Sequence, residues 1–458
     1  MNISDEMEKQ LPRGCKIIEF PLAVDDRGAL SFAEGARHIP FQIERVFWIY
    51  DVPEGKTRGG HSHCETAEVV IPLNGSFTIT VDDGRHSAEV RMESSGKGIL
   101  IPQGVWCHLH DFAPGTICLV FASHPYDASG YINDYSEYLN EQLSVVRYDL
   151  SRQTEWDSFV RISKNGTFLL ERGYMDYHAA RFTDCSLMFY KKGNLIAMLP
   201  ANWKEDEGTV QSHGGLTYGG LIVSPSMVAI NVLEVFSCAI DWMKRELGAH
   251  RWLYKPIPYI YSSIPAEEDL YALFRSGAVL KERGISSVID CSNRLPMRQS
   301  RKSGCVKATK SGLRIEQGNM TSHLEAFWNI LAGILNEKHG KNPVHTVSEL
   351  QLLHSRFPEN IKLFVALKEE SVEAGALIYD TGKVVHTQYL ASSEYGKRNG
   401  ALDLLLRNLI DDVYSDRTYF DFGVSTEDGG AFLNEGLIFQ KEGFGARSIV
   451  YDTYEMLF

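Results

Sequence analysis

Residues 55–75 read GKTRGGHSHCETAEVVIPLNG, and this stretch decides how the N-terminal part of the chain is interpreted. His61 and His63 are two residues apart, so in a strand their side chains lie on one face. Glu68 follows beyond a predicted turn, and glycines stand at both ends of the stretch. The residues alone leave three alternatives open: a metal site, an acid/base pair, or the polar interior of a barrel.

The surrounding sequence, over residues 15–125, consists of many short runs rich in β-branched and aromatic residues. Examples are CKIIEFPLAV, ERVFWIYDV, AEVVIPL, SFTITV, AEVRM, GILIP and TICLVFAS, separated by turn sequences such as DDRG, PEG, LNG and DDG. Short strands with glycine turns and no helical period predict an antiparallel barrel or sandwich. The segment YDASGYINDYSEYLNEQ is predicted to end this all-β block as a short helix or an extended tail.

Two glycine-bounded motifs make the barrel assignment more specific. The spacing of Gly55, His61, His63, Glu68 and Gly75 resembles the first cupin motif. The stretch GKGILIPQGVWCHLHD resembles the second, with Cys107 where a histidine is usual. A closer resemblance, over residues 15–140, is to the dTDP-sugar 3,4-ketoisomerases. It is carried by DDRGALSF, IPFQIERVFWIYDVPEG, RGGHSH, GSFTITVDDG, GILIPQGVW and CLVFASHPYDASGYINDY.

That resemblance implies a small, usually dimeric cupin barrel that moves the carbonyl of a dTDP-4-keto-6-deoxyhexose from C4 to C3. The reaction removes the C3 proton and delivers one at C4, work that suits an imidazole. We expect His63 to be the principal proton shuttle and His61 to orient it or assist. The sequence departs from the family pattern at Cys64, where lysine is common, and at Glu68, where glutamine is common.

Glu68 also completes a set of metal-ligand types. His61, His63, Glu68 and Cys107 are residues that bind Zn²⁺ or Fe²⁺ in other proteins. The alternative is that Glu68 only fixes a histidine tautomer and Cys107 belongs to the core. Since the isomerisation needs no metal, we expect none to be required.

Three arginines and two tryptophans in the matching motifs are candidates for holding the nucleotide. Guanidinium groups suit a diphosphate, which makes Arg27, Arg45 and Arg58 candidate substrate-binding residues. Trp106, like Trp48, is a candidate for stacking on thymine, with a place in the barrel core as the alternative.

From about Trp156 the pattern changes to strands alternating with amphipathic helices. The helical runs are NVLEVFSCAIDWMKREL, SHLEAFWNILAGILNEKHG and GALDLLLRNLIDDVY. The order hairpin, strand, polar turn and helix occurs twice, which indicates an internal duplication. We therefore predict a multidomain chain: an all-β cupin barrel over 1–145, a linker over 146–155 and an α/β domain over 156–458. SKNGTFLLERGYMDYHAARF, SHGGLTYGGLIV and YFDFGVSTEDGGAFLNEGLIFQKEGFG resemble the tandem-GNAT, FemAB-like proteins.

This second resemblance implies acyl transfer. The turn in ASSEYGKRNGALDLLLRNLI resembles the acetyl-CoA pyrophosphate loop of GNAT acyltransferases, so Gly396, Lys397, Arg398 and Gly400 are candidate cofactor-binding residues, although the glycine spacing is longer than usual.

Acyl transfer to an amine needs a base and an oxyanion donor. We take His213 and Asp421 as the catalytic candidates. The other polar candidates are Tyr174, Tyr177, His178, Tyr218, Ser425, Asn434 and Glu435, and His386 is predicted to lie in a strand interior.

Composition limits the remaining possibilities. The chain has 458 residues, enough for two or three domains, and a net charge of −13 that disfavours nucleic acid as a partner. The absence of a long apolar run and of CxxC spacing predicts a cytoplasmic protein that does not bind a membrane. We expect a bifunctional enzyme of nucleotide-sugar biosynthesis for O-antigen or another surface glycan, dimeric through its cupin domain. It would isomerise a dTDP-linked keto sugar and, after transamination by another enzyme, N-acylate a dTDP-3-amino-3,6-dideoxyhexose from acetyl-CoA.

Three rival interpretations remain. One is an isomerase with an aminoacyl-transferring or non-catalytic C-terminal domain. Another is a metal-dependent cupin coupled to a transferase, and the third is a sugar-binding cupin without turnover.

Overall fold

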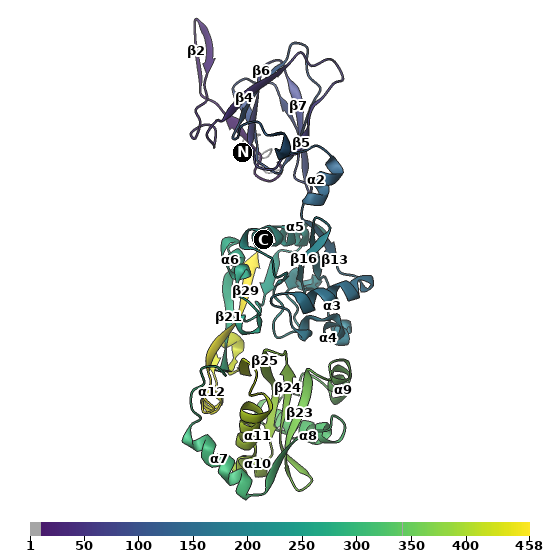
Figure 1. Ribbon diagram of the computed structural model, residues 1–458, viewed down its shortest axis with the longest axis vertical. Coiled ribbons are helices and arrows are strands. Elements are labelled where there is room, and N and C mark those ends of the chain that lie inside the picture. The colour runs from purple at the N-terminus through teal and green to yellow at the C-terminus, as the bar shows by residue number, and fades with distance from the viewer. Residues whose placement is uncertain (1–10, 341) are drawn as a thin grey trace. The chain divides into compact units, whose positions relative to one another are not determined.

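The computed structural model describes residues 11–340 and 342–458, which form two compact units (Figure 1). The first unit runs to Leu143 and includes Lys191–Gly193; the second comprises Ser144–Tyr190 and Asn194–Phe458. The division thus falls two residues before the predicted boundary at 145. The predicted linker 146–155 differs from the structure, because these residues lie in elements of the second unit: the end of β13 (Ser144–Arg147), η2 (Leu150–Arg152) and the start of α3 (Gln153–Ile162).

The first unit is built from two five-stranded antiparallel sheets, which agrees with the predicted all-β domain. In order, one sheet is β1 (Lys16–Glu19), β9 (Lys97–Ile101), β6 (Glu68–Asn74), β11 (Ile117–Ala122) and β4 (Arg45–Tyr50). The other is β12 (Tyr131–Ile132), β5 (Arg58–His63), β10 (Trp106–His110), β7 (Phe77–Asp82) and β8 (Ser87–Met92). Alternate residues such as Phe77, Ile79 and Val81 are fully buried and form the core. The segment predicted to end the block as a short helix or an extended tail contains the helix α2 (Tyr135–Glu141).

Some strands of this unit lack the pattern that predicts a strand. β5 contains Gly59 and Gly60, both with positive φ, and pairs with β10 across a register shift after Cys107. A Cβ on Gly59 would lie 2.8 Å from the carbonyl oxygen of Cys107, so only glycine permits this close approach. β2 (Leu22–Asp25) and β3 (Gly28–Ser31) form a separate two-stranded hairpin.

The second unit contains an eleven-stranded sheet and a four-stranded sheet. The larger sheet runs β14 (Thr183–Asp184), β17 (Asn202–Lys204), β18 (Thr209–Gln211), β20 (Arg251–Tyr254), β29 (Arg447–Leu457), β21 (Val279–Asp290), β26 (Tyr419–Val424), β25 (Val384–Ser392), β24 (Ser371–Asp380), β23 (Ile361–Lys368) and β22 (Leu313–Gln317). The smaller sheet runs β13, β15 (Leu187–Lys191), β16 (Asn194–Leu199) and β19 (Ile222–Val223). β27 (Thr426–Glu427) and β28 (Phe432–Leu433) form a short hairpin.

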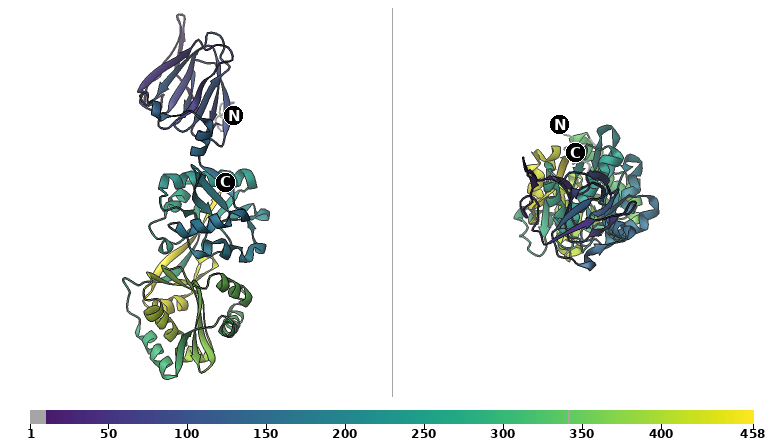
Figure 2. Two further views of the ribbon diagram at one scale, coloured as in Figure 1. Left: turned by 45° about the vertical axis from the view of Figure 1, so that its right-hand side comes forward. Right: turned by 90° about the horizontal axis from the view of Figure 1, so that it is seen from above.

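Helices lie on both sides of these strands (Figure 2). The three helices predicted from amphipathic runs are α5 (Ala229–Leu247), α8 (Ser322–His339) and α11 (Ala401–Asn408). The others are α4 (Arg172–Met175), α6 (Glu268–Arg275), α7 (Gln299–Lys310), α9 (Val347–Arg356), α10 (Glu394–Asn399) and α12 (Glu435–Glu442). Strands β18 and β20 pair in parallel and enclose α5 in sequence, while β25 and β26 pair in parallel and enclose α10 and α11. Each of these two regions thus has a parallel strand pair with helices between its strands in sequence.

Within the described residues, no helix combines the length and the apolar composition that crossing a membrane requires.

Candidate functional site

His61 and His63 lie side by side at the end of β5, and their ring centroids are 4.9 Å apart. Glu68, at the start of β6 in the facing sheet, places its Oε1 3.1 Å from Nε2 of His63. Arg45 on β4 reaches the same carboxylate, with Nη2 3.4 Å from Oε1. The strand alternation therefore predicted the histidine pair and the motif spacing predicted Glu68, and the fold brings the guanidinium group of Arg45 to them.

Tyr131 on β12 completes this cluster, and the sequence analysis missed it. Its ring centroid lies 4.3 Å from that of His63 and 4.9 Å from that of His61. The hydroxyl of Tyr131 accepts a hydrogen bond of 3.4 Å from Nη1 of Arg45. β12 has only two residues, so it carries no period by which a sequence identifies a strand. Only its pairing with β5 places Tyr131 against the histidines.

The electrostatics of the cluster favour a neutral imidazole on His61. Burial lowers the pKa of His61, and the neighbouring His63 lowers it further. A neutral ring can accept a proton from a substrate carbon. The arrangement is thus suited to taking up and returning protons inside a largely apolar barrel.

The same cluster contains a possible metal site. Ligand atoms of His61, Glu68 and Cys107 all lie within 4.8 Å of one another, and this N, O and S donor set is one that Zn²⁺ accepts. Burial and the charge of Glu68 raise the pKa of the Cys107 thiol, which opposes formation of the thiolate that binds metal. Metal independence stays a prediction, to be tested by elemental analysis.

The predicted substrate-binding residues lie in different places. Arg45 belongs to the histidine cluster, and Arg58 is exposed at the start of the same strand as the histidines. Arg27 lies at the tip of the β2–β3 hairpin with 85% of its side chain exposed, and it pairs with Asp25. Trp106 packs against Tyr135 and Tyr138 of α2, with centroids 5.1 and 5.4 Å away.

In the second unit, Asp421 on β26 is fully buried, and its carboxylate accepts hydrogen bonds from five neighbouring residues. The donors are the hydroxyls of Tyr261, Ser286 and Tyr451, the amide of Gly423, and Nδ1 of His386 at 2.9 Å. Burial opposes ionisation of Asp421, but His386, Ser286 and Tyr451 together hold the pKa of this carboxyl well below its usual range. Asp421 therefore accepts hydrogen bonds from its neighbours and is held ionised by them.

His386 is oriented by this contact, which its place in a strand did not suggest. Because an ionised carboxylate only accepts hydrogen bonds, Nδ1 of His386 carries the hydrogen of this contact. His213 lies in a different cluster, in the loop between β18 and β19, and burial lowers its pKa to about 3. Burial thus favours the neutral ring of His213.

The predicted acetyl-CoA turn borders a cavity of about 280 Å³, which is lined by Gly396, Lys397 and Gly400. Two backbone amides of the turn already donate hydrogen bonds within the protein. The amide of Gly396 donates to Oγ of Ser393 at 2.9 Å, and the amide of Lys397 donates to the carbonyl of Ser393 at 2.8 Å. A Cβ on Gly396 would collide with the carbonyl of Glu373, and one on Gly400 with that of Gly304. Close packing alone therefore explains why glycine stands at both positions. A pyrophosphate bound at this turn would depend on the side chains of Lys397 and Arg398.

Comparison with known proteins assigns the first unit. The family model described as "FdtA: WxcM-like, C-terminal" matches residues 13–143. The TDP-4-oxo-6-deoxy-alpha-D-glucose-3,4-oxoisomerase of Aneurinibacillus thermoaerophilus is 36% identical over 123 residues, which are 27% of this chain and 88% of that protein. A 3,4-ketoisomerase structure from Helicobacter canadensis is 36% identical and covers 28% of this chain and 95% of its own, with a TM-score of 0.27.

The second unit is similar in fold to a different protein. The structure of FemX covers 69% of this chain and 97% of its own length, with a TM-score of 0.50 and 13% identity. The first unit is too small to account for that coverage, so the likeness lies mainly in the second unit and concerns the fold alone. For the first unit, by contrast, the identity extends over nearly the whole relative. Through residues 13–143, the chain belongs to the FdtA, WxcM-like family of sugar-nucleotide 3,4-ketoisomerases.

Proposed function

We propose that the first unit converts a dTDP-4-keto-6-deoxyhexose into its 3-keto isomer. The observation that carries this proposal is the cluster of His61, His63, Glu68 and Tyr131 in a chain that belongs to the ketoisomerase family. His63 removes the proton from C3 while the C4 carbonyl oxygen gains one, which gives an enediol. Loss of the C3 hydroxyl proton and protonation at C4 then give the 3-ketone, with no net oxidation.

The remaining residues of the cluster would hold the substrate. Arg45 lies beside Glu68 and Tyr131 and is the arginine best placed for the sugar or its diphosphate. Arg58 is exposed at the edge of the same site, where a diphosphate would emerge into solvent. Arg27 and Trp106 stay as weaker candidates, because one pairs with Asp25 and the other packs on α2.

The test is a proton NMR assay with dTDP-4-keto-6-deoxyglucose in D₂O. We expect the 3-keto product and deuterium at C4, since the enediol is protonated from solvent-exchanged groups. The assay is repeated after chelation, together with elemental analysis. Metal-free protein with full activity supports the metal-independent mechanism. One equivalent of zinc or iron, with activity lost on its removal, would instead make His61, Glu68 and Cys107 ligands.

We further propose that the second unit N-acylates a dTDP-3-amino-3,6-dideoxyhexose from acetyl-CoA. A 3-keto sugar is what an aminotransferase needs to form that amine, which connects the two activities chemically. In the transfer, the sugar nitrogen bonds to the acetyl carbon, the thioester C–S bond breaks, and CoA leaves as the thiol. The FemX-like fold, the Asp421–His386 pair and the cavity beside Lys397 support the proposal.

Incubation of the full chain with the amino sugar and acetyl-CoA, followed by mass spectrometry, tests this second activity. We expect an increase in sugar mass by one acetyl group and release of free CoA thiol. His386→Asn should slow the transfer while leaving isomerisation unchanged. If no product forms at millimolar acetyl-CoA, the assignment of acetyl-CoA as the acyl donor is overturned, and an aminoacyl donor is tested next.

We also propose that the chain dimerises through its first unit. The exposed β2–β3 hairpin carries Leu22, Val24 and Leu30, and the edge strand β4 exposes Val46, Trp48 and Tyr50. Exposed apolar side chains in this number favour an interface. Light scattering should give twice the chain mass, and Leu22→Glu with Val24→Lys should give the monomer.

A further inference from the structure

The end of β26 and the residue after it, 423–425, lie directly beside the Asp421–His386 pair. The amide of Gly423 donates to Oδ1 of Asp421 at 2.9 Å. A Cβ on Gly423 would lie 3.2 Å from Cε1 of His386, so this residue passes close to the imidazole ring. Its φ of 74° is a backbone conformation that glycine adopts without strain. Gly423 thus contacts both members of the pair, and whatever holds this segment in place also holds the pair.

Helix α12 and its N-cap hold the segment through its backbone carbonyls. Nζ of Lys441 donates to the carbonyls of Gly423 and Val424, each at 2.8 Å. The amide of Asn434, the N-cap of α12, donates to the carbonyl of Ser425 at 2.9 Å. The short hairpin of β27 and β28 lies between the segment and α12 in sequence and returns the chain, so that these groups meet. The carbonyls nearest to the pair therefore depend on one lysine side chain.

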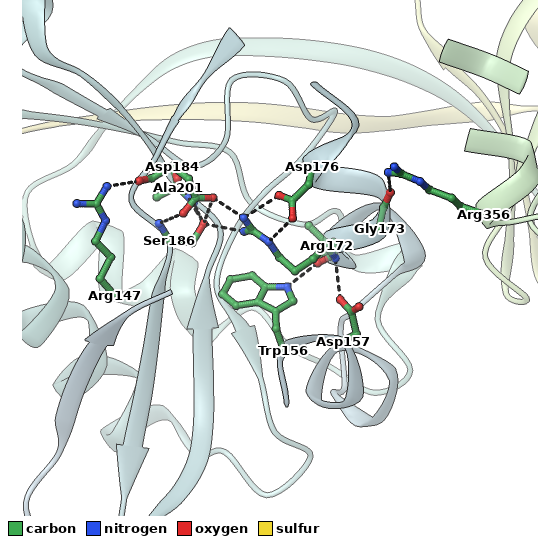
Figure 3. Close-up of polar contacts among 11 residues, drawn as sticks. Arg147, Trp156, Asp157, Arg172, Gly173, Asp176, Asp184, Ser186, Ala201 and Arg356 are labelled. Atoms are coloured by element: carbon green, nitrogen blue, oxygen red, sulfur yellow. Dashed lines mark hydrogen bonds and ion pairs between the residues drawn. The ribbon is translucent and has the colours of Figure 1, made fainter. Parts of the chain in front are cut away.

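Lys441 is a buried cation without a carboxylate partner. The residue is 6% exposed, and among the residues that the structure describes its Nζ has no carboxylate oxygen at ion-pair distance. Burial of a charge is costly, so buried cations are usually paired with an anion. Arg172 shows the usual arrangement, since its Nη2 lies 2.8 Å from Asp176 and 2.9 Å from Asp184 (Figure 3). The unusual surroundings of Lys441 indicate that its hydrogen bonds to the segment serve a purpose.

Asp421 is the carboxylate whose charge acts on Lys441 from farther away. Burial lowers the pKa of Lys441 to about 8, and the negative charge of Asp421 opposes that change. The groups that act on the carboxylate from the surrounding elements are His386 on β25, Tyr261 in η6 (Tyr259–Tyr261), Tyr451 on β29 and Lys441 on α12. Loss of the lysine charge would therefore change the electrostatics of the pair as well as the hold on the segment.

We propose that Lys441 is a positioning residue for the Asp421–His386 pair. By binding the carbonyls of residues 423 and 424, its ammonium keeps the Gly423 amide on the carboxylate and the Gly423 backbone against the imidazole. Lys441 itself does not touch the substrate. The effect on rate rests on the proposed acyl transfer, whereas the arrangement of the pair can be measured without turnover.

The hydrogen on Nδ1 of His386 reports on the pair directly. In the full chain, labelled with nitrogen-15 in its histidines, we expect this hydrogen to give a downfield NMR resonance in slow exchange with water. Its absence in His386→Asn assigns it. Lys441→Met keeps an unbranched apolar side chain and loses the ammonium, so it should shift the resonance and accelerate exchange about tenfold or more. Lys441→Gln should change both less, because its amide can still donate to a carbonyl.

The rate of acetyl transfer is the second readout, followed with the amino sugar and acetyl-CoA. Lys441→Met should lower kcat about tenfold to hundredfold, the factor that hydrogen bonds from a charged donor contribute. The KM values for both substrates should change less than about twofold, because the lysine contacts neither of them. A side chain that served stability alone would lower the melting temperature and leave kcat of the folded protein unchanged.

Lys302→Met is the control, since it makes the same substitution at an exposed lysine on α7 and should match the wild type in both readouts. Circular dichroism establishes folding, and Lys441→Gln takes over both tests if Lys441→Met does not fold. A wild-type resonance in the folded Lys441 variants would overturn the inference, and so would the same changes in Lys302→Met. A resonance that responds as expected in a protein that acetylates nothing would leave the positioning role standing and remove the proposed transfer. Acetylation with an unchanged kcat in a folded Lys441 variant would do the reverse.

Discussion

At the scale of single residues, two histidines on one strand have different surroundings. His63 lies 3.1 Å from Glu68, whereas the ring of His61 lies between His63 and Tyr131. Glu68 thus contacts His63 directly, whereas burial and the neighbouring His63 lower the pKa of His61.

His63→Asn should therefore lower the isomerisation rate by roughly 10²–10⁴-fold, the usual contribution of a general base. Binding of dTDP should change little, because asparagine keeps a polar side chain of similar size. The rate is followed by NMR and the binding by calorimetry. His86→Asn, on the exposed turn before β8, is the control and should behave as wild type. Turnover near the wild-type rate in His63→Asn would remove His63 from the mechanism.

Tyr131→Phe tests the residue that sequence analysis missed. The variant keeps the ring that packs on both histidines and loses the hydroxyl that Arg45 contacts. Since one hydrogen bond contributes about 0.5–1.5 kcal/mol, we expect a decrease in kcat of about threefold to tenfold. The pH–rate profile should also shift, because Arg45 loses a partner beside Glu68. An unchanged rate and an unchanged pH–rate profile would show that Tyr131 only packs against the histidines and takes no part in the reaction.

Buried histidines should make the second unit sensitive to acid. Burial lowers the pKa of His213 to about 3 and that of His345 to about 4, from an ordinary value of 6.5. Below pH 6.5 the unfolded chain binds more protons than the folded one, so the free energy of unfolding decreases as the pH is lowered. The loss continues down to the folded pKa values, at up to about 1.4 kcal/mol per pH unit for each ring.

Calorimetry at pH 7.5 and 5.0 measures this loss. His345→Gln should reduce the dependence of the transition on pH, because one titrating ring is removed. A second-unit transition that is equally stable at both pH values would contradict the burial of these rings.

The residues that could be predicted were those whose local pattern carries the information. His61 and His63 follow from strand alternation, and Glu68 from motif spacing. Tyr131 and the role of His386 could not be predicted in this way, because each depends on a contact between strands far apart in sequence. The same limit applies to the arginines: nothing in the sequence distinguishes Arg45, in the cluster, from Arg27, on an exposed hairpin.

At the scale of elements, β5 shows how backbone shape positions the site. Two positive-φ glycines precede the histidines, and the register with β10 shifts between Cys107 and His108. Without this irregularity, β5 could not approach β10 so closely. The sequence RGGHSH has no strand period, which is why motif spacing was a better guide here than periodicity. Long amphipathic runs such as α5 and α8, by contrast, were predicted directly from their period.

Gly59→Ala should damage this element. Its Cβ would lie 2.8 Å from the carbonyl oxygen of Cys107, and alanine must also adopt φ of 72°. We expect a loss of stability of at least about 1–3 kcal/mol, together with slower isomerisation. Gly55→Ala is the matched control: it has φ of 71° but nothing within 4 Å of the added Cβ, so it isolates the backbone cost. Equal melting temperatures for the two variants would show that the close approach to β10 does not matter.

At the scale of the whole molecule, the chain divides into two units with separate cores. We expect residues 1–143 alone to retain isomerase activity and residues 144–458 alone to bind acetyl-CoA. Each fragment keeps its own sheets intact, and none of the named sheets spans both. Circular dichroism establishes folding before either assay. A folded but inactive N-terminal fragment would contradict the assignment of the isomerase to one unit.

The position of β29 has a consequence for how this protein is made. β29 follows every other described strand in sequence, yet it lies between β20 and β21 inside the large sheet. During translation we expect the first unit to fold as soon as it leaves the ribosome. The second must wait, with the edges of β20 and β21 that face β29 unpaired, until residues 447–457 emerge. Two unpaired strand edges invite association with other chains. A premature stop codon shortly before Arg447 would therefore yield a working isomerase attached to an insoluble partner domain, and not merely a shortened second unit.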